Sequence, residues 1–358
     1  MVRPTWAEID LGAIRRNVAA IADVISPSEV CAVVKADGYG HGDAPVAMAA
    51  IDGGATRLAV ALVEEGIRLR EAGIEDQIIV LSEPDHETAP ELAAWELTPS
   101  VYTADFAHAL SSAGFAGGVH VKLDTGMHRV GVSPHDWPEL IEAVRSHGLA
   151  IEGVFTHFAV ADEDPEFTQM QIDLFDEVVD MDVPVTHLAN TPGALLFPDA
   201  RRDMCRIGLG IYGLHPCADT RAVVDLVPAM SVITHVSHVQ RLPAGTRPSY
   251  GRIKALEQES TVVTIPIGYA DGFWRNLSES GRVLIGGQSH PLAGTVTMDQ
   301  TVIDVRDTDV AVGDQVVLVG DQGDETITAD EWADKLGTIS YEIVCSIGPR
   351  VPRRYSNE

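Results

Sequence analysis

The sequence predicts an N-terminal (β/α)8 barrel of the TIM type followed by a mainly antiparallel β domain. Eight short apolar segments recur through the first two thirds of the chain, and stretches with helical period separate them. Strand and helix repeated eight times is the sequence form of such a barrel. At 358 residues the chain exceeds a single core of ~250–300 residues. We therefore expect a barrel over residues 11–221 and a β domain over 1–10 and 222–358.

The barrel elements follow one another in a regular order. The apolar segments lie at 29–36, 56–62, 77–82, 97–103, 119–125, 151–158, 185–191 and 204–214. Helical periodicity is clear at 44–54, 63–73, 104–114, 133–148 and 165–180. Glycine closes "REAG" and "SHG", and "DEDPEF" supplies acidic caps and a proline for a helix start.

From about residue 222 the pattern changes to alternating strands and turn signals. "AMSVITHVSHVQRL", "STVVTIPIGYADG", "GRVLIGG" and "VGDQVVLVG" are typical of antiparallel strands, and one helix is expected in "TADEWADKLG". The first segment, "TWAEID", can pair with this domain, although the sequence does not settle its partners.

Composition excludes several classes of function. The net charge of −28 would repel nucleic acid and anionic membranes. No apolar run approaches the ~18 residues of a membrane span, and "MVRPTWAEID" has no signal-peptide pattern, so we expect a cytoplasmic protein. The four cysteines form no C-x-x-C pair and no residues show metal-ligand spacing, which predicts reduced cysteines and no metal.

Polar residues gather where barrel chemistry takes place, at the carboxyl ends of the strands. They are Lys35 and Tyr39 after the first strand, Lys122, Asp124 and Arg129 at the fifth, His157 at the sixth, His187, Asn190 and Thr191 at the seventh, and Arg206 and Gly208 at the eighth. This is a concentration of cations in a chain poor in basic residues.

Each residue alone has a simpler interpretation. Lys35 can extend to solvent, His187 is more typical of a satisfied core histidine, and Asp124 can orient a neighbour instead of acting as a base. Together they favour one chemistry. A reactive lysine with small residues that can donate to phosphate after the last two strands suggests pyridoxal phosphate held as a Schiff base, because neither a carboxylate pair nor a metal cluster is present.

The chain as a whole resembles the alanine racemases, which are fold-type III pyridoxal-phosphate enzymes. The resemblance rests on "AVVKADGYGHG", "VKLDTGMHRVG", "FTHFAVADE", "HLANT", "CRIGLGIYGL", "PSYG", "IPIGYADGF", "GTVTMDQ" and "ISYEIVCSIGPRVPR", in family order along the whole chain. Thr191 stands where serine is usual, and its hydroxyl can still donate to phosphate.

The resemblance implies a role for each matching residue. Lys35 and Tyr250 are the two bases, and His157, Arg206 and Arg129 complete the catalytic set. Tyr39, Asn190, Thr191, Gly208, Leu209 and Tyr341 bind the cofactor with Lys35, His157 and Arg206. Arg129, Tyr269, Met298 and Asp299 bind the substrate. Lys122 matches a lysine that is often carbamylated, with solvation or a pair with Asp124 as the ordinary alternative.

Two of these residue types have a direct chemical reason. Racemisation needs a base on each face of the carbon. A tyrosine has a reference pKa of ~10 and is a weak base at neutral pH, but a neighbouring positive charge and a histidine would favour its ionised form. An arginine facing the pyridine nitrogen disfavours its protonation, which argues against the fold-related decarboxylases.

The resemblance also implies a homodimer with shared active sites, since Tyr250 lies in the β domain. We expect the chain to interconvert L-alanine and D-alanine, the latter supplying peptidoglycan precursors. Three alternatives stay open: a racemase of broader small amino acids such as serine, a non-catalytic pyridoxal-phosphate carrier, and a decarboxylase.

Overall fold

The computed structural model describes residues 3–357 and divides into two compact units. One comprises Gly12–Gly38 and Gly42–Val227 and is called here the barrel unit. The other, the β unit, comprises the residues up to Leu11, Tyr39–His41 and the residues from Pro228 on.

The barrel unit contains eight parallel strands in sequential order, which confirms the predicted fold class. They are β2 (Glu29–Val33), β3 (Ala55–Val60), β4 (Gln77–Val80), β5 (Thr98–Val101), β6 (Gly118–Lys122), β7 (Ala150–Phe155), β8 (Val185–His187) and β9 (Met204–Ile207). Their order is β8-β7-β6-β5-β4-β3-β2-β9. Backbone hydrogen bonds from Asp203 N to Thr186 O at 3.2 Å and from Arg206 N to Ala189 O at 2.9 Å close the circle.

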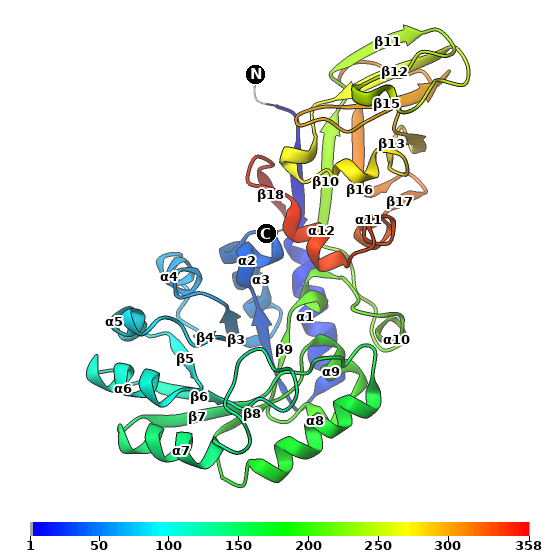
Figure 1. Cartoon of the computed structure of the whole chain (residues 1–358). Helices are drawn as coiled ribbons and strands as arrows, with labels where there is room; N and C mark the ends of the chain where they lie inside the picture. The colour runs from blue at the N-terminus through cyan, green and yellow to red at the C-terminus, as the bar shows by residue number, and fades with distance from the viewer. Residues whose placement is uncertain (1–2, 358) are drawn as a thin grey trace. The chain divides into compact units, whose positions relative to one another are not determined.

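The helices of this unit lie on the outer side of the strands (Figure 1). They are α1 (Leu11–Ile25), α2 (Lys35–Tyr39), α3 (Asp43–Asp52), α4 (Val63–Glu71), α5 (Ala89–Ala94), α6 (Ala104–Ser112), α7 (Trp137–Ser146), α8 (Pro165–Val178), α9 (Thr191–Leu196) and α10 (Ala218–Arg221). Short 3-10 turns are η1 (His86–Thr88), η2 (Pro198–Ala200) and η3 (Leu209–Tyr212).

Local sequence explains where these helices begin, end and pack. Asp164 caps α8 by accepting a hydrogen bond from Phe167 N at 3.0 Å, as the "DEDPEF" segment predicts. Gly73 and Gly148 follow α4 and α7 in the left-handed conformation, with φ of 88° and 73°. Helix α7 buries Trp137, Leu140, Ile141 and Val144, one face at helical spacing.

The β unit is built mainly from antiparallel strands. They are β1 (Trp6–Asp10), β10 (Met230–His235), β11 (His238–Leu242), β12 (Ser260–Ile265), β13 (Arg282–Ile285), β14 (Gln288–Pro291), β15 (Thr301–Arg306), β16 (Gln315–Gln322), β17 (Glu325–Ile327) and β18 (Arg353–Ser356). One sheet has the order β14-β13-β16-β10-β1-β18 and another the order β11-β12-β15. The first strand pairs antiparallel with β10 and parallel with β18, which answers the question that the sequence left open.

The expectation of one helix in this unit was wrong. Besides α11 (Ala329–Leu336), the chain forms α12 (Ser340–Ser346), and 3-10 turns are η4 (Tyr250–Arg252), η5 (Tyr269–Asp271) and η6 (Arg275–Ser278). Helix α12 buries Ser340, Ile343 and Val344 on one face. A seven-residue segment with two β-branched residues has little helical signal of its own, so this buried face decides its conformation.

Candidate active site

The turn after strand β2 has an unusual backbone. Lys35 follows Val34, and the next residues, Ala36, Asp37 and Gly38, have φ of 53°, 54° and 59° with ψ of 45–50°. Tyr39 continues the series with φ of 51°. Left-handed conformation costs a residue with a side chain about 1–2 kcal/mol, so other contacts must hold this turn.

Glu65, in the first turn of α4, supplies part of that support. Its carboxylate accepts hydrogen bonds from Ala36 N at 2.7 Å, Ala61 N at 2.8 Å and Leu62 N at 3.1 Å. The residue is buried at 6% exposure. Analysis of the sequence missed it, although a glutamate at the third position of a helix after a strand is a recognisable capping signal.

Tyr39 and Tyr341 lie near each other in the β unit, with ring centroids 6.1 Å apart. Burial raises the pKa of Tyr39 above its usual value, with smaller contributions from Tyr341 and Cys345, so its phenol stays protonated. Gly40 next to it has φ of 78°, and a Cβ atom there would lie 2.4 Å from Val344 O. Only glycine fits between this turn and α12.

Buried cations gather at the strand ends of the barrel unit. Lys122 at the end of β6 is 5% exposed and Arg206 on β9 is 3% exposed, and both lie over the Phe155 ring, at 5.4 Å and 5.2 Å from its centroid. Burial, together with the charges of Arg206, Arg129 and Lys35, lowers the pKa of Lys122 to about 8, and Asp124 acts in the opposite direction. The predicted concentration of cations is present.

Asp124 has other partners close by. Its carboxylate accepts hydrogen bonds from Gly126 N and His128 N, both at 3.0 Å, and lies 3.2 Å from His128 Nδ1. These contacts and the charge on His128 hold the pKa of Asp124 below its usual value, although burial acts in the opposite direction. Asp124 therefore organises the loop that leads to Arg129.

Arg206 is held by fixed acceptors. Nη1 donates to His187 O at 2.7 Å, and Nη2 donates to Thr156 O at 2.8 Å and Leu188 O at 2.9 Å. Nη1 also lies 2.8 Å from His187 Nδ1, and Nη2 lies 3.3 Å from His157 Nδ1. Burial lowers the pKa of Arg206 to about 10, so it remains a cation at neutral pH.

A chain of imidazoles continues from this arginine. Because the guanidinium only donates, His187 Nδ1 accepts and its Nε2 carries the proton, which is donated to His120 Nδ1 at 2.8 Å. Burial, followed by the charge of Arg206, lowers the pKa of His157 and His187 well below 6.5. His187 is a satisfied core histidine, as the sequence suggested, and the imidazoles are neutral at physiological pH.

Four of the residues expected at the cofactor, Asn190, Thr191, Gly208 and Leu209, lie in the barrel unit at the ends of β8 and β9. The Thr191 hydroxyl accepts a hydrogen bond from Gly208 N at 3.1 Å, and Leu209 begins η3. Asn190 caps α9 by accepting from Gly193 N at 3.1 Å. This end of β8 and β9 presents a hydroxyl and a helical-turn N-terminus side by side, a donor set that suits a phosphate.

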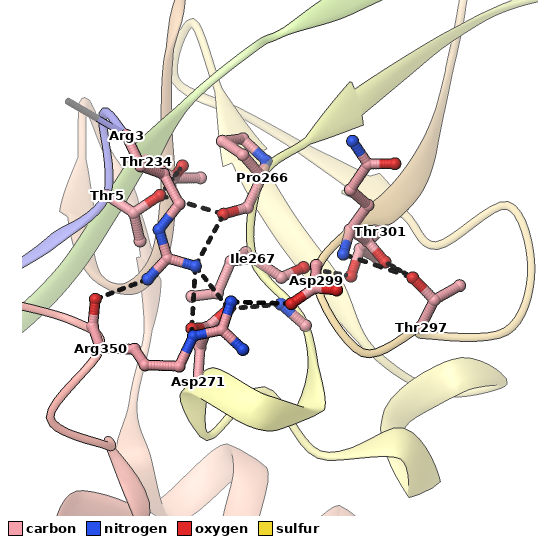
Figure 2. Close-up of polar contacts among 12 residues, drawn as sticks. Arg3, Thr5, Thr234, Pro266, Ile267, Asp271, Thr297, Asp299, Thr301 and Arg350 are labelled. Atoms are coloured by element: carbon pink, nitrogen blue, oxygen red, sulfur yellow. Dashed lines mark hydrogen bonds and ion pairs between the residues drawn. The ribbon is translucent and has the colours of Figure 1, made fainter. Parts of the chain in front are cut away.

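Tyr250 and three of the four expected substrate residues, Tyr269, Met298 and Asp299, lie in the β unit and are open to solvent, whereas Arg129 lies in the barrel unit. Tyr250 is 74% exposed, Met298 is 51% and Tyr269 is 42%. Tyr269 N donates to Thr297 O at 3.0 Å and Ala270 N donates to Met298 O at 3.1 Å, so η5 and the loop before β15 are joined. Asp299 of that loop is paired with Arg350 at 2.7 Å (Figure 2).

Residues 3–357 contain neither a candidate membrane span nor a candidate metal site. Over that range the structure has no helix that is long and apolar enough to cross a membrane, and no group of three or more potential ligands is placed to hold a metal ion.

A parallel eight-stranded barrel whose strand ends bring together buried cations, joined in one chain to an antiparallel β unit, defines a barrel enzyme with a cation-rich site. The family model described as "Alanine racemase, N-terminal domain" matches residues 9–216, and "Alanine racemase, C-terminal domain" matches 229–355. The chain belongs to the alanine racemase family, whose enzymes are isomerases.

Individual relatives agree with this assignment. An alanine racemase of Halothermothrix orenii is 41% identical, with 100% of this chain and 98% of that protein covered. The structure of a Bacillus anthracis alanine racemase with bound L-Ala-P has a TM-score of 0.94 and 36% identity, covering 100% of this chain and 96% of that one. A Leuconostoc mesenteroides histidine racemase has a TM-score of 0.91 at 29% identity, covering 99% and 98%.

Proposed function

We propose that this chain interconverts L-alanine and D-alanine with pyridoxal phosphate, and that the D-alanine supplies peptidoglycan synthesis. Family membership supports the reaction class, and the relative with bound L-Ala-P supports the substrate. The observation that carries the proposal is Arg206, a buried guanidinium fixed by three backbone carbonyls at a barrel strand end. A permanent cation there suits a racemase and opposes a decarboxylase.

The residues of the barrel unit fit the cofactor. Lys35 would form the covalent link, the Thr191 hydroxyl and the Leu209 amide would donate to the phosphate, and the Gly208 amide would hold the Thr191 oxygen in place. Tyr39, Tyr341 and Asn190 are further phosphate or cofactor ligands in this proposal. Pyridoxal phosphate supplies electron withdrawal that allows the α-proton to leave.

Proton transfer is assigned to two bases on opposite faces. Lys35 Nζ takes or returns the proton on one face, and Tyr250 Oη does so on the other. His157 accepts from Arg206 at Nδ1 and is neutral, so its Nε2–H can donate to the phenolate form of Tyr250. His157 therefore tunes the tyrosine and does not act as the base itself.

Arg206 limits side reactions in this proposal. Its guanidinium stays protonated because its pKa of about 10 lies well above neutral pH. With the cofactor bound, the Arg206 guanidinium would disfavour protonation of the pyridine nitrogen and so weaken the cofactor as an electron acceptor. Return of a proton to that same carbon is then favoured over transamination.

The substrate carboxylate is assigned to Arg129, with Tyr269, Met298 and Asp299 at the entrance. We also propose that Lys122 is carbamylated, which would turn a like charge near Arg129 into an anion that orients it. Tyr250 and Tyr269 would favour substrates with small side chains. One extra hydroxyl on the substrate, as in serine, is hard to reject sterically.

A homodimer with shared sites follows from the assignment of Tyr250. This exposed tyrosine lies with Ile253, Tyr269 and Met298 among the large apolar side chains that the β unit leaves open to solvent. Such side chains are typical of an interface. We propose that each barrel unit is completed by the β unit of the partner subunit.

Solvent deuterium uptake at the α-carbon tests the reaction. L-alanine should racemise with deuterium uptake in the unsubstituted enzyme, and racemisation should fall by several orders of magnitude in both Tyr250→Phe and Lys35→Ala, because each variant lacks one of the two bases. Greater uptake from L-serine would favour the broader racemase, and carbon dioxide release would favour the decarboxylase. No uptake, with a visible cofactor band fixed by borohydride, would leave only the carrier.

Mixed dimers test the shared site. The mixed dimer carries Lys35→Ala on one chain and Tyr250→Phe on the other. One site then keeps both bases and the other loses both. The mixed dimer should therefore have about half of the activity of the unsubstituted dimer, whereas either pure variant should have almost none. Full activity or none in the mixed dimer would reject sites shared between chains.

A further inference from the structure

Asp271 is a carboxylate with 0% side-chain exposure in the β unit. It ends η5, the turn that begins with Tyr269. Arg3 Nη1 donates to both of its oxygens at 2.8 Å (Figure 2). Gly268 N donates to Oδ2 at 3.1 Å. A buried charge needs such partners, and these fix its position.

Arg350 joins this buried carboxylate to an exposed one. Its Nε lies 3.4 Å from Asp271 Oδ1, and its Nη2 donates to Asp299 Oδ1 at 2.7 Å (Figure 2). The Asp299 side chain is 57% exposed, whereas that of Asp271 is not exposed at all. Arg3 Nη2 in turn donates to Arg350 O at 2.6 Å, so the same N-terminal residue holds the backbone of this arginine.

The backbone of the entrance also has hydrogen bonds of its own. Gly268 lies so close to the neighbouring loop that a Cβ would be 2.1 Å from Thr297 O and 2.5 Å from Met298 O. Thr297 N and its hydroxyl donate to Gln300 O at 3.1 Å and 2.8 Å, which closes the loop into a tight turn. The ion pair between Arg350 and Asp299 adds a further support to the same loop.

We propose that Arg350 is a positioning residue for the substrate entrance, using Asp271 as its anchor to hold Asp299. The inference rests on the proposed function, because that function makes Tyr269, Met298 and Asp299 the entrance. Without the guanidinium, Asp299 would present an uncompensated negative charge to an incoming carboxylate in a chain that already has a net charge of −28. Loss of the Arg350 guanidinium should therefore weaken substrate binding more than it slows proton transfer.

Arg350→Gln tests this in the holoenzyme. KM for L-alanine should rise roughly fivefold, the scale of one exposed ion pair, while kcat stays within about twofold. The effect should shrink near 1 M salt, where the screening length is about 3 Å. In an Asp299→Asn background the same substitution should leave KM unchanged, because the charge that it exposes is gone. Arg350→Lys should recover part of the loss.

Arg282→Gln is the matched control. This arginine also lies in the β unit, at 27% exposure, and it pairs with Glu331 and Glu325 at 2.7 Å and 3.1 Å. Its substitution should lower the melting temperature and leave KM alone. A KM shift equal to that of Arg350→Gln would assign the effect to general destabilisation and overturn the inference.

Hydrogen–deuterium exchange separates this inference from the proposed function. Exchange of residues 297–300 should rise in Arg350→Gln and not in Arg282→Gln. Unchanged exchange in Arg350→Gln would overturn the positioning role even in an active enzyme. Absence of turnover in the unsubstituted chain would overturn the proposed function, and a rise in loop exchange would still support the contact between Arg350 and Asp299.

Discussion

Glu65 accepts a hydrogen bond from the amide of Ala36 at 2.7 Å, one residue after Lys35. The same carboxylate holds two amides at the start of α4, so the lysine turn and the next strand–helix connection share one support.

Glu65→Gln should therefore loosen the lysine turn. Its amide nitrogen cannot accept, so at least one backbone donor loses its partner, which should cost about 1–3 kcal/mol in the free energy of unfolding and weaken cofactor binding. Urea unfolding and cofactor titration measure both. The exposed neighbour Glu64→Gln is the control, and equal behaviour of the two variants would contradict the role.

Gly40→Ala should disturb the Tyr39 turn against α12. The new Cβ would lie 2.4 Å from Val344 O, so the backbone itself must move. Gly73→Ala is the control, because Gly73 also has a positive φ, of 88°, but nothing within 4 Å, and it should cost only the ~1–2 kcal/mol of left-handed strain. Thermal unfolding and cofactor affinity should separate them, and equal losses would refute a special fit at Gly40.

Lys122 should form a carbamate in the presence of carbon dioxide. Its pKa of about 8 leaves about half of the amines neutral at pH 8, and the neutral nitrogen attacks carbon dioxide, forms a C–N bond and releases one proton to solvent. A ¹³C carbamate signal from labelled bicarbonate should appear in the enzyme and vanish in Lys122→Met. An unmodified amine in electron density would reject it.

Acid should destabilise the barrel unit through its buried imidazoles. Burial lowers the pKa of His120 to about 3, whereas an unfolded imidazole binds a proton near pH 6.5. The unfolded state therefore holds more protons below pH 6.5, and stability falls as the pH drops from there toward 3. His120→Gln should reduce this slope by up to about 1.4 kcal/mol per pH unit in urea unfolding between pH 6 and 4.5. An identical slope would mean that His120 is already charged in the fold.

The barrel was predictable because its strands are short apolar runs separated by stretches with helical period, and several of them carry a polar residue at the carboxyl end. Lys35, Lys122 and Arg206 were found by that rule alone, since strand ends meet at one face. Helix α12 was not predictable, because a seven-residue segment with two β-branched residues has little helical signal of its own.

The supporting residues were hidden for the same physical reason. Arg3 and Asp271 are 268 residues apart, and neither has a local motif that marks a pair. Glu65 had a local signal as a helix cap, but its bond to Ala36 spans 29 residues and depends on the left-handed turn. Residue type at a strand end is visible in a sequence, whereas the partner that fixes a side chain is not.

The position of β1 has a consequence for how the chain is made. This strand precedes the eight barrel strands in the sequence, and it pairs with β10 on one side and β18 on the other, both of which follow them. All eight barrel strands leave the ribosome before β10 or β18 has been made. The barrel can therefore collapse while both edges of β1 are still unpaired. The β unit is completed only once β18 has been made, and with it the surroundings of every entrance residue proposed here.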